Sequence, residues 1–437
     1  MAADTPDKRE VGYARAARNW ALDDDNPDLR FPQSARVFAK MFREDSKVSA
    51  TYKAITLPIR RANWQLSDNG APDDIVAHVA SDLRLSILGE DPNTPRPRST
   101  GRVSFDKHLE QALYSTLFGC MFFEQIYEAG DDGREHLVKL APRWPGTVEK
   151  VNVAPDGGLE SIEQRADHIG TRTLDRTEIP VEHLVAYAYN DVGSSWTGTS
   201  AFRSVYKNWR LKDELARIEV IAIDRNGTGV PIYTGTELTN DPDGDLERGE
   251  QLARESRVGE FAGGAIPAGA KLDFKGVSGQ VMLPRESIAA HDDQIAVASL
   301  ANFLNLEGGG GSYALAETQS NFFNQSEQTL AEWIADVFNQ HVIEDLVRVA
   351  YPEYDGPCPQ VVFDAIGSRR DLSAQDLVAL TNSKVIQTDM PLEEHVRRLY
   401  SLPAKEPYEE YVQRLSDRKD VASEAGVNVS DDTDKET

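Results

Sequence analysis

The sequence predicts an α+β fold in which a mixed domain of short helices and strands is followed by long helices around a small strand-containing insert. Three observations predict it. Residues 46–200 alternate between apolar residues at helical spacing and short runs rich in aromatic and β-branched residues. Residues 201–225 contain neither glycine nor proline, which favours one continuous helix. Two more helical runs follow, separated by the four glycines Gly308–Gly311.

The composition is that of a folded, acidic protein. Of 437 residues, 40% are apolar and 27% are charged, which is enough for two or three units with cores of their own. The net charge is −25 and no segment is rich in lysine and arginine, so we do not expect tight, static binding of nucleic acid. If DNA is a partner, this chain is suited to let it slide.

The sequence shows no sign of membrane insertion or disulfide bonding. Its apolar stretches are shorter than the roughly 20 residues that cross a bilayer. Residues 1–20 lack the apolar region of a secretory signal. Cys120 and Cys358 are too few for a disulfide framework or a zinc cluster, and we expect reduced thiols in a cytoplasmic protein. We therefore expect no membrane partner.

The first 200 residues are predicted to form an arm and a mixed domain. Residues 1–45 combine charge and proline with little periodicity, which is typical of a partly ordered arm. Apolar periodicity predicts three helices, over 46–61, 72–88 and 104–118. Short alternating runs predict strands over 63–66, 120–128, 137–140, 148–153, 159–165 and 183–189.

A long charged helix and a small insert come next. We expect the helix over 201–225, about 37 Å long at about 1.5 Å per residue, with a stop at Asn226-Gly227. Residues 229–279 are rich in glycine and in short strand-like runs, with a charged helix predicted over 241–258. The short strands between flanking helices predict a compact α/β lobe.

The rest of the chain is mainly helical. Residues 284–306 carry small side chains that suit close packing against a neighbour, and residues 314–350 carry a stripe of large apolar ones. A strand is predicted over 361–366. Three shorter helices are predicted over 373–386, 392–402 and 408–417. The acidic tail 419–437 lacks aromatic residues and is expected to be disordered.

No motif predicts catalysis or cofactor binding. The segment Gly264–Lys271 is a poor phosphate-binding loop, because Ala270 displaces the lysine and Leu272 stands where a hydroxyl is needed. The eight histidines form no His-Glu-x-x-His pattern, and no Gly-x-Ser-x-Gly elbow occurs. Asp292 and Asp293 offer the carboxylates of a two-metal site, but an exposed or inter-subunit role is favoured. We predict no catalytic residue, no metal site and no cofactor.

The glycine run has two interpretations. Four consecutive glycines disfavour a helix by about 1 kcal/mol each. The first interpretation is an ordinary flexible linker. The second is a mobile loop between two helices that changes shape in use. Both stay open on the residues alone.

Several segments in a defined order carry a family resemblance: Phe42–Leu66, Gly119–Glu128, Leu140–Arg143, Gly198–Lys212 and Gly227–Pro231. The first is a helix that leads to a tryptophan-bearing strand, and the fourth opens the long charged helix. Together with the order of the elements, they resemble the portal proteins of tailed double-stranded DNA bacteriophages, especially the Mu-like portal family. The resemblance covers about residues 35–405.

The resemblance implies a division of the chain. Such subunits have an α+β wing, a helical stem, a small α/β clip, a long connector helix and a helical C-terminal region. The parts here would be an N-terminal arm (1–45), wing (46–200), first stem helix (201–227), clip (228–283), second stem helix (284–305), tunnel loop (306–313), long helix with a wing strand (314–369), crown-like helices (370–418) and acidic tail (419–437).

The resemblance also implies a structural function without enzyme activity. Twelve copies would form a ring at the portal vertex of the capsid, as part of the virion, and would assemble in the host cytoplasm. The ring would form the channel for DNA packaging and genome ejection. Its partners would be the terminase large subunit, head–tail connector or adaptor proteins, capsid and scaffold proteins, and double-stranded DNA that passes without sequence specificity.

The resemblance places the tunnel loop nearest to the passing DNA. Its residues are Leu306, Glu307, Gly308, Gly309, Gly310, Gly311, Ser312 and Tyr313. Glu307 is the one charged residue among them, so a ring of these loops would contact phosphates without trapping them.

Two alternative functions are open at this point. One is a nucleic-acid-processing enzyme, a two-metal nuclease that uses Asp292 and Asp293. The other is a different ring-forming head–tail connector protein built from similar helices.

Overall fold

The computed structural model describes residues 24–90, 101–165, 167–169, 172–228, 230–255, 265–275, 284–298, 313–367 and 381–383. The chain forms two compact units, Met1–Ser368 and Arg369–Thr437. In the second unit only 381–383 are described. The helices predicted over 392–402 and 408–417 and the acidic tail therefore lie outside the described residues.

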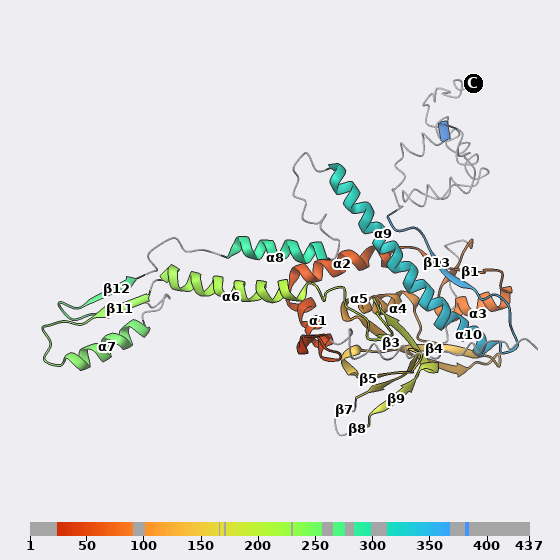
Figure 1. Cartoon of the computed structure of the whole chain (residues 1–437), viewed down its shortest axis with the longest axis horizontal. Helices are drawn as coiled ribbons and strands as arrows, with labels where there is room; N and C mark the ends of the chain where they lie inside the picture. The colour runs from red at the N-terminus through yellow and green to blue at the C-terminus, as the bar shows by residue number, and fades with distance from the viewer. Residues whose placement is uncertain are drawn as a thin grey trace, which may run out of the picture. The chain divides into compact units, whose positions relative to one another are not determined.

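The largest core lies between a three-stranded antiparallel sheet and helices that cover it (Figure 1). The sheet has the order β10–β3–β4, with β3 at Cys120–Ala129, β4 at Glu135–Arg143 and β10 at Leu184–Ala188. Its helices are α3 (Asp73–Leu83), α4 (Phe105–Ala112), α9 (Tyr313–Phe338) and α10 (Glu344–Ala350). The hairpin and the strand predicted over 120–140 and 183–189 are confirmed.

A smaller sheet closes the edge of this core. Strand β1 (Trp64–Ser67) pairs in parallel with β2 (Ser86–Ile87) and antiparallel with β13 (Gln360–Phe363). The helix predicted over 72–88 is too long, because α3 ends at Leu83. Arg84 adopts a left-handed conformation with φ of 58°, which turns the chain into β2.

The residues expected to form a partly ordered arm include a helix that the sequence interpretation missed. Helix α1 (Gln33–Glu44) packs on α2 (Ser46–Arg61) and α5 (Tyr114–Phe118), after the short turn η2 (Pro27–Leu29). Its inner face buries Phe38 and Met41 in a second hydrophobic cluster. Ala35, Phe38, Met41 and Phe42 recur at helical spacing, so the expectation of a partly ordered arm was wrong for this segment.

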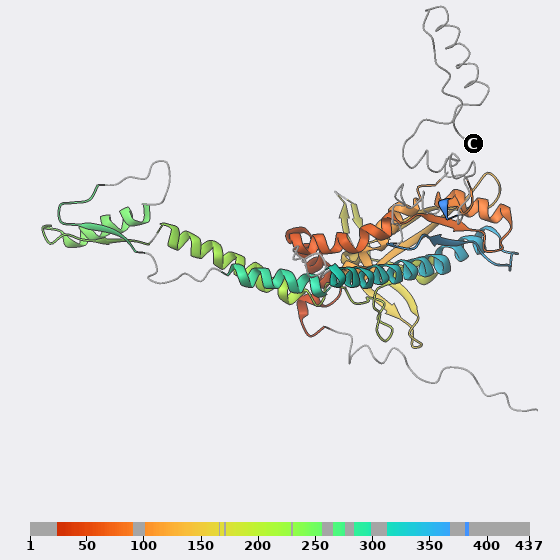
Figure 2. The ribbon, with the colours of Figure 1, turned by 90° about the horizontal axis from the view of Figure 1, so that it is seen from above.

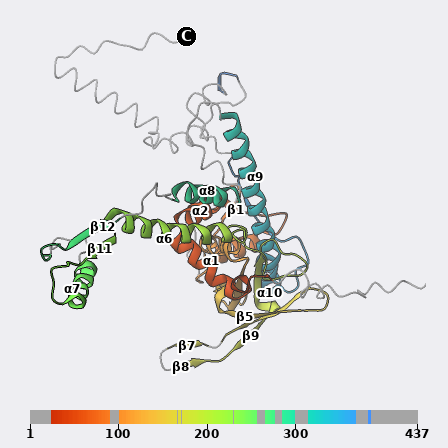
Figure 3. The same ribbon diagram turned by 60° about the vertical axis from the view of Figure 1, so that its left-hand side comes forward.

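A second antiparallel sheet forms a third cluster beside the first one. Its order is β5–β6–β9, with β5 at Val148–Val153, β6 at Leu159–Gln164 and β9 at Thr177–Pro180. The hairpin of β7 (Asp167–Ile169) and β8 (Arg172–Leu174) projects beyond it (Figure 3). The pairing predicted for 148–153 with 159–165 is confirmed.

Helix α6 (Tyr206–Thr228) leads to a small lobe, and α8 (Arg285–Ala298) follows that lobe in the chain (Figure 2). The lobe contains helix α7 (Pro242–Glu255), packed on an antiparallel pair of β11 (Val230–Thr234) and β12 (Lys271–Lys275). The predicted long helix begins later than expected, because residues 201–205 form turns. Residues 299–306 of the predicted second helix lie outside the described residues.

The long helix predicted over 314–350 is interrupted. Between α9 and α10 lies one π-helical turn, η6 (Asn339–Ile343). Such turns insert an extra residue and commonly mark functional positions. Here the Asn339 side chain accepts a hydrogen bond from the backbone N–H of Val361 at 2.8 Å, which fixes β13 against the helix.

No helix among the described residues is long and apolar enough to span a bilayer.

A buried polar pair inside the main core yields a first prediction. His108 Nε2 lies 2.8 Å from the Tyr187 hydroxyl, and burial lowers the pKa of His108 to about 3, so its ring is neutral at neutral pH. Replacing Tyr187 by phenylalanine leaves this nitrogen without its partner. We expect Tyr187→Phe to lower the free energy of unfolding by about 1–3 kcal/mol in chemical denaturation.

Tyr354→Phe is the matched control, because the Tyr354 hydroxyl donates to the Pro357 carbonyl at 2.9 Å near the surface. We expect it to change stability by less than about 0.5 kcal/mol. An equal loss in both variants would contradict the role of the buried pair.

Candidate functional site

The helices α6 and α8 lie side by side and run in opposite directions (Figures 1 and 2). We call them the helix pair. Arg285 Nε, at the start of α8, donates to Glu219 Oε1 at 2.7 Å. Further along α8, His291 Nδ1 lies 3.1 Å from Asn208 Oδ1, near the start of α6. The order of these contacts fixes the antiparallel arrangement.

One lysine of the helix pair joins it to the start of α2. Lys212 Nζ donates to Asp292 Oδ1 of α8 at 2.6 Å and to Asp45 Oδ2 at 2.9 Å. The other oxygen of Asp45 caps α2 by accepting from the backbone N–H groups of Lys47 and Val48 at 2.8 and 3.0 Å. Burial alone would lower the pKa of Lys212, but the two carboxylates outweigh it and raise that pKa.

This lysine also decides what Asp292 does. The sequence offered Asp292 and Asp293 as carboxylates of a two-metal site, with an exposed or inter-subunit role favoured. Asp292 instead forms an ion pair with Lys212 inside the chain, and Asp293 is exposed. Among the described residues, the group of side chains that could hold a metal includes neither aspartate. The geometry therefore does not favour a nuclease.

The outward surface of α6 becomes apolar in its second half, beyond the exposed charged residues Asp213, Glu214 and Arg217. Leu211, Ile218 and Ile221 are exposed on one flank of its contact with α8, and Val220 and Ile223 are exposed on the other, at about 100° of rotation per residue. Val220 is 67% exposed and Ile218 is 53% exposed. Isolated exposed aliphatic residues are ordinary, but a group on both flanks of one helix marks a protein contact.

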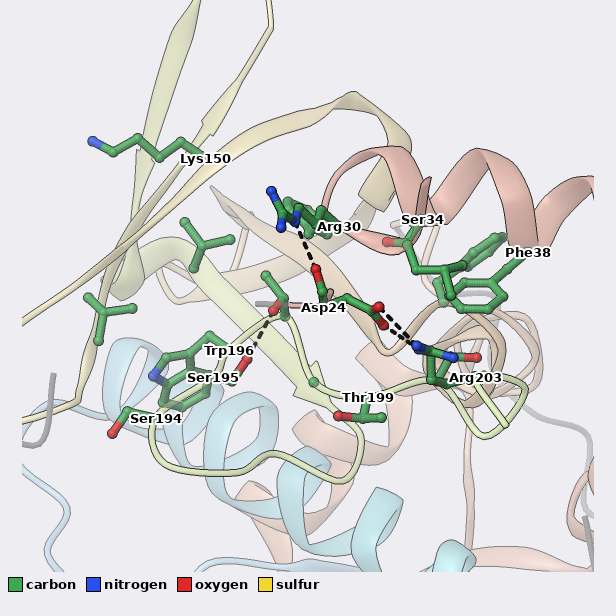
Figure 4. A pocket seen from close by; sticks show the side chains of 18 of the residues that line it. Asp24, Arg30, Ser34, Phe38, Lys150, Ser194, Ser195, Trp196, Thr199 and Arg203 are labelled. Atoms are coloured by element: carbon green, nitrogen blue, oxygen red, sulfur yellow. Dashed lines mark hydrogen bonds and ion pairs between the residues drawn. The ribbon is translucent and has the colours of Figure 1, made fainter. Parts of the chain in front are cut away.

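A cavity of about 340 Å³ lies at the base of the helix pair, between α1, β5 and the loop before α6 (Figure 4). Asp24 lies within it, where its carbonyl accepts from Arg30 Nε at 2.8 Å and its Oδ1 from Arg203 Nη2 at 2.9 Å. Burial raises the pKa of Asp24, but the hydrogen bonds from Arg203 and from the Asn26 backbone, with the charges of Arg203 and Arg30, together outweigh it and hold that pKa below its usual value. Trp196 Nε1 donates to the Gly157 carbonyl at 2.9 Å.

The chemistry of this cavity is that of a structural joint. Its acidic and basic side chains are largely engaged in ion pairs. Arg203 pairs with Asp24 inside the cavity, and Lys150 pairs with Glu163, which lies outside its lining. Among the described residues that line it there is no histidine or cysteine to act as a base or nucleophile. It therefore positions the loop before α6 against α1.

A second cavity, of about 420 Å³, contains an uncompensated acid that the sequence analysis missed. Glu327 of α9 is only 2% exposed, and neither carboxylate oxygen has a hydrogen-bond partner among the described residues. Burial raises its pKa to about 8. A signal was present, because Glu327 shares a helical stripe with Leu330 and Ile334.

Most of the predicted tunnel loop lies outside the residues that the structure describes. Leu306–Ser312 lie outside the described residues, and Tyr313 is the first residue of α9. The channel role of this loop stays a prediction.

One comparison with known proteins identifies a family. The family model described as "Portal protein of Mu bacteriophage" matches residues 35–402. No curated protein matches the chain.

Solved structures of similar fold come from virus-like and phage particles. "Neck of native GTA particle computed with C12 symmetry" is 13% identical with a TM-score of 0.50, over 86% of this chain and 95% of that chain. "Virion of native gene transfer agent (GTA) particle" is 13% identical with a TM-score of 0.49, over 86% and 95%. An HK97 family phage portal protein from Corynebacterium diphtheriae is 13% identical with a TM-score of 0.38, over 75% and 95%. The first likeness confirms the α+β fold.

The buried Glu327 makes stability depend on pH. Its pKa is about 8 in the folded chain against an ordinary 4.5, so between these values the folded state holds a proton that the unfolded state has lost. Stability contributed by this group is therefore full below about pH 4.5 and falls as pH rises towards 8. We expect Glu327→Gln to be more stable than the wild type above that range by on the order of 2–4 kcal/mol.

The measurement is chemical denaturation of the unassembled chain across this pH range. Glu332→Gln, at an exposed position of the same helix, should leave the pH profile unchanged. Parallel profiles for the wild type and Glu327→Gln would show that the carboxyl is not desolvated.

Proposed function

The chain belongs to the portal protein family of Mu bacteriophage, and from that membership we propose how its parts build a portal. A portal protein is a structural component of the phage virion at a vertex of the capsid. We propose that this chain forms the DNA channel there, for packaging and for ejection, as a closed ring of identical subunits. It performs no chemical reaction in this role.

The observation that carries the ring is the apolar surface on both flanks of α6. One subunit covers a single face of α6 with α8, and two further faces with large aliphatic side chains face solvent. A head-to-tail ring gives every subunit one neighbour on each side, so both flanks become buried. A mutual two-fold contact would cover only one flank of each subunit.

The number of subunits follows from family membership rather than from packing. We propose twelve copies, and the neck structure of the gene transfer agent particle was computed with C12 symmetry. Twelve chains carry 12 × −25 = −300 charges. Such a ring repels a phosphate backbone at long range, so double-stranded DNA passes without sequence-specific contacts.

We assign the parts of the ring as follows. The helix pair is the stem, and the lobe of β11, α7 and β12 is the clip, which docks the terminase large subunit and later the head–tail connector proteins. The α+β domain is the wing, which meets capsid and scaffold proteins. The loop 306–313 faces the channel. Assembly takes place in the host cytoplasm.

The competing functions have weaker support. A nuclease needs carboxylates free to bind metal ions, whereas Asp292 is held by Lys212. A different head–tail connector would not carry the portal family match over residues 35–402.

Flank variants of α6 test the ring. In Ile218→Asp/Ile221→Asp one flank is charged, and in Val220→Asp/Ile223→Asp the other is charged. Neither protein should form rings in native mass spectrometry or electron microscopy, because every contact uses one damaged flank. An equimolar mixture should form heterodimers, in which the two intact flanks meet.

Leu88→Asp is the matched control, because Leu88 is 54% exposed and lies outside the helix pair. It should assemble like the wild type. Rings from either double variant would refute the assignment of α6 to the subunit contact, and a mixture that stays monomeric would refute the head-to-tail geometry.

The glycine run tests the channel role. Replacing Gly308–Gly311 by alanines removes the residues that disfavour helix by about 1 kcal/mol each, and should stiffen the link between the helices. We expect rings of normal mass and a failure to package or retain DNA in an in vivo complementation assay. Normal packaging by this variant would remove the tunnel-loop role and leave an ordinary linker.

A further inference from the structure

A second cluster of titratable side chains lies away from the helix pair, where α3 meets the turn between β3 and β4. His78 and Asp82 are one helical turn apart on α3. Asp132 lies in the turn, and His136 lies at the start of β4. The sequence predicted no metal site. Asp82 and His136, for example, stand 54 positions apart, and the cluster matches no spacing motif.

Asp82 fixes the orientation of His136. Asp82 Oδ1 lies 2.8 Å from His136 Nδ1, and Asp82 Oδ2 accepts from the backbone N–H of Leu137 at 2.9 Å. The Asp82 side chain is almost fully buried. A carboxylate that holds one ring nitrogen of a histidine directs the other nitrogen outwards, which is the usual support of a metal-binding histidine. Here that other nitrogen, Nε2, lies 3.2 Å from Asp132 Oδ1.

His78 supplies a second nitrogen, which lies near Asp82 without a hydrogen bond. Its side chain is only 4% exposed, and its Nε2 makes no hydrogen bond with any described residue. The distance from this atom to Asp82 Oδ2 is 3.5 Å. The His78 and His136 rings stack with centroids 4.4 Å apart. A buried polar nitrogen without a partner costs free energy, which a bound ligand would recover.

The three groups converge on one point. One ligand atom from each of His78, Asp132 and His136 lies within 4.8 Å of the other two. Two ligands about 2.0–2.2 Å from one ion stand a little over 3 Å apart, which matches the separation between His136 Nε2 and Asp132 Oδ1. We propose that His78, His136 and Asp132 form a binding site for a divalent transition metal ion, with Zn²⁺ as the best match.

The surroundings suit a cation. The positive charge of Arg134 acts on His78, but its guanidinium lies over the Tyr351 ring at 4.3 Å and is paired with Asp74 at 3.5 Å rather than with Asp132. Asp132 lies in an exposed turn, which gives an ion access from solvent and leaves room for a water ligand. Two imidazoles and one carboxylate favour zinc and similar ions over Mg²⁺ or Ca²⁺. The ion would join α3 to the β3–β4 turn.

The test is zinc binding by the full chain, purified without a histidine tag and treated with a chelator. Isothermal titration with ZnCl₂ should show one saturable site per chain. His136→Ala should abolish it. Asp132→Asn should weaken it by about tenfold or more, in the range found for altered groups around zinc sites. Asparagine keeps the acceptor that Asp132 Oδ1 offers to the Arg134 backbone N–H at 3.0 Å.

Two controls separate this site from adventitious binding. Asp131→Asn changes the neighbouring exposed carboxylate in the same turn, and His183→Ala changes an exposed histidine elsewhere. Both should bind zinc like the wild type. Absence of a saturable site in the wild type, or equal loss in Asp131→Asn and Asp132→Asn, would overturn the proposal. If circular dichroism shows that His136→Ala is misfolded, the two turn variants decide the result.

Discussion

The arrangement of this subunit depends on the exposure of α6. The surface of this helix faces all directions, and a single chain covers only part of it. Helix α8 buries the side that carries Asn208, Lys212 and Glu219. Along residues 218–223, aliphatic side chains occupy the remaining flanks, where a solitary soluble helix would carry charge. The single subunit thus leaves an apolar surface exposed to solvent. Such a surface is typical of proteins that bury it in a contact with another subunit.

The junction around Lys212 couples this incomplete helix to the rest of the subunit. Asp45 has two tasks, since one of its oxygens caps α2 while the other holds Lys212. Rotation of α6 or α8 would therefore disturb the start of α2, which packs against α9. The buried lysine is stable in this position only because Asp45 and Asp292 both compensate its charge. A contact made along the helix pair has a direct mechanical route into the α+β domain.

Most of the secondary structure could be predicted from local pattern, and most of the site could not. The β3–β4 hairpin and the long helices follow from period and turn residues. The end of α3 at Leu83 could not be foreseen, because Arg84 adopts a left-handed conformation that no residue type announces. Lys212, Glu327 and the His78–His136 pair owe their roles to partners distant in sequence, or to missing partners. Among these residues, only Glu327 could have been noticed from the sequence, because it lies on an apolar stripe of its helix.

The small lobe after α6 shows how such a subunit can change through evolution. Val230, at the start of β11, pairs with Lys275, at the end of β12, so the chain leaves and re-enters the lobe at one pair of residues. An insertion whose two ends are adjacent disturbs the surrounding fold little. Its length and sequence do not change the distance between the two points where the chain enters and leaves it. The lobe can be exchanged for one of another size while the helix pair keeps its geometry. The sequence of the lobe and that of the helix pair are therefore free to diverge at different rates.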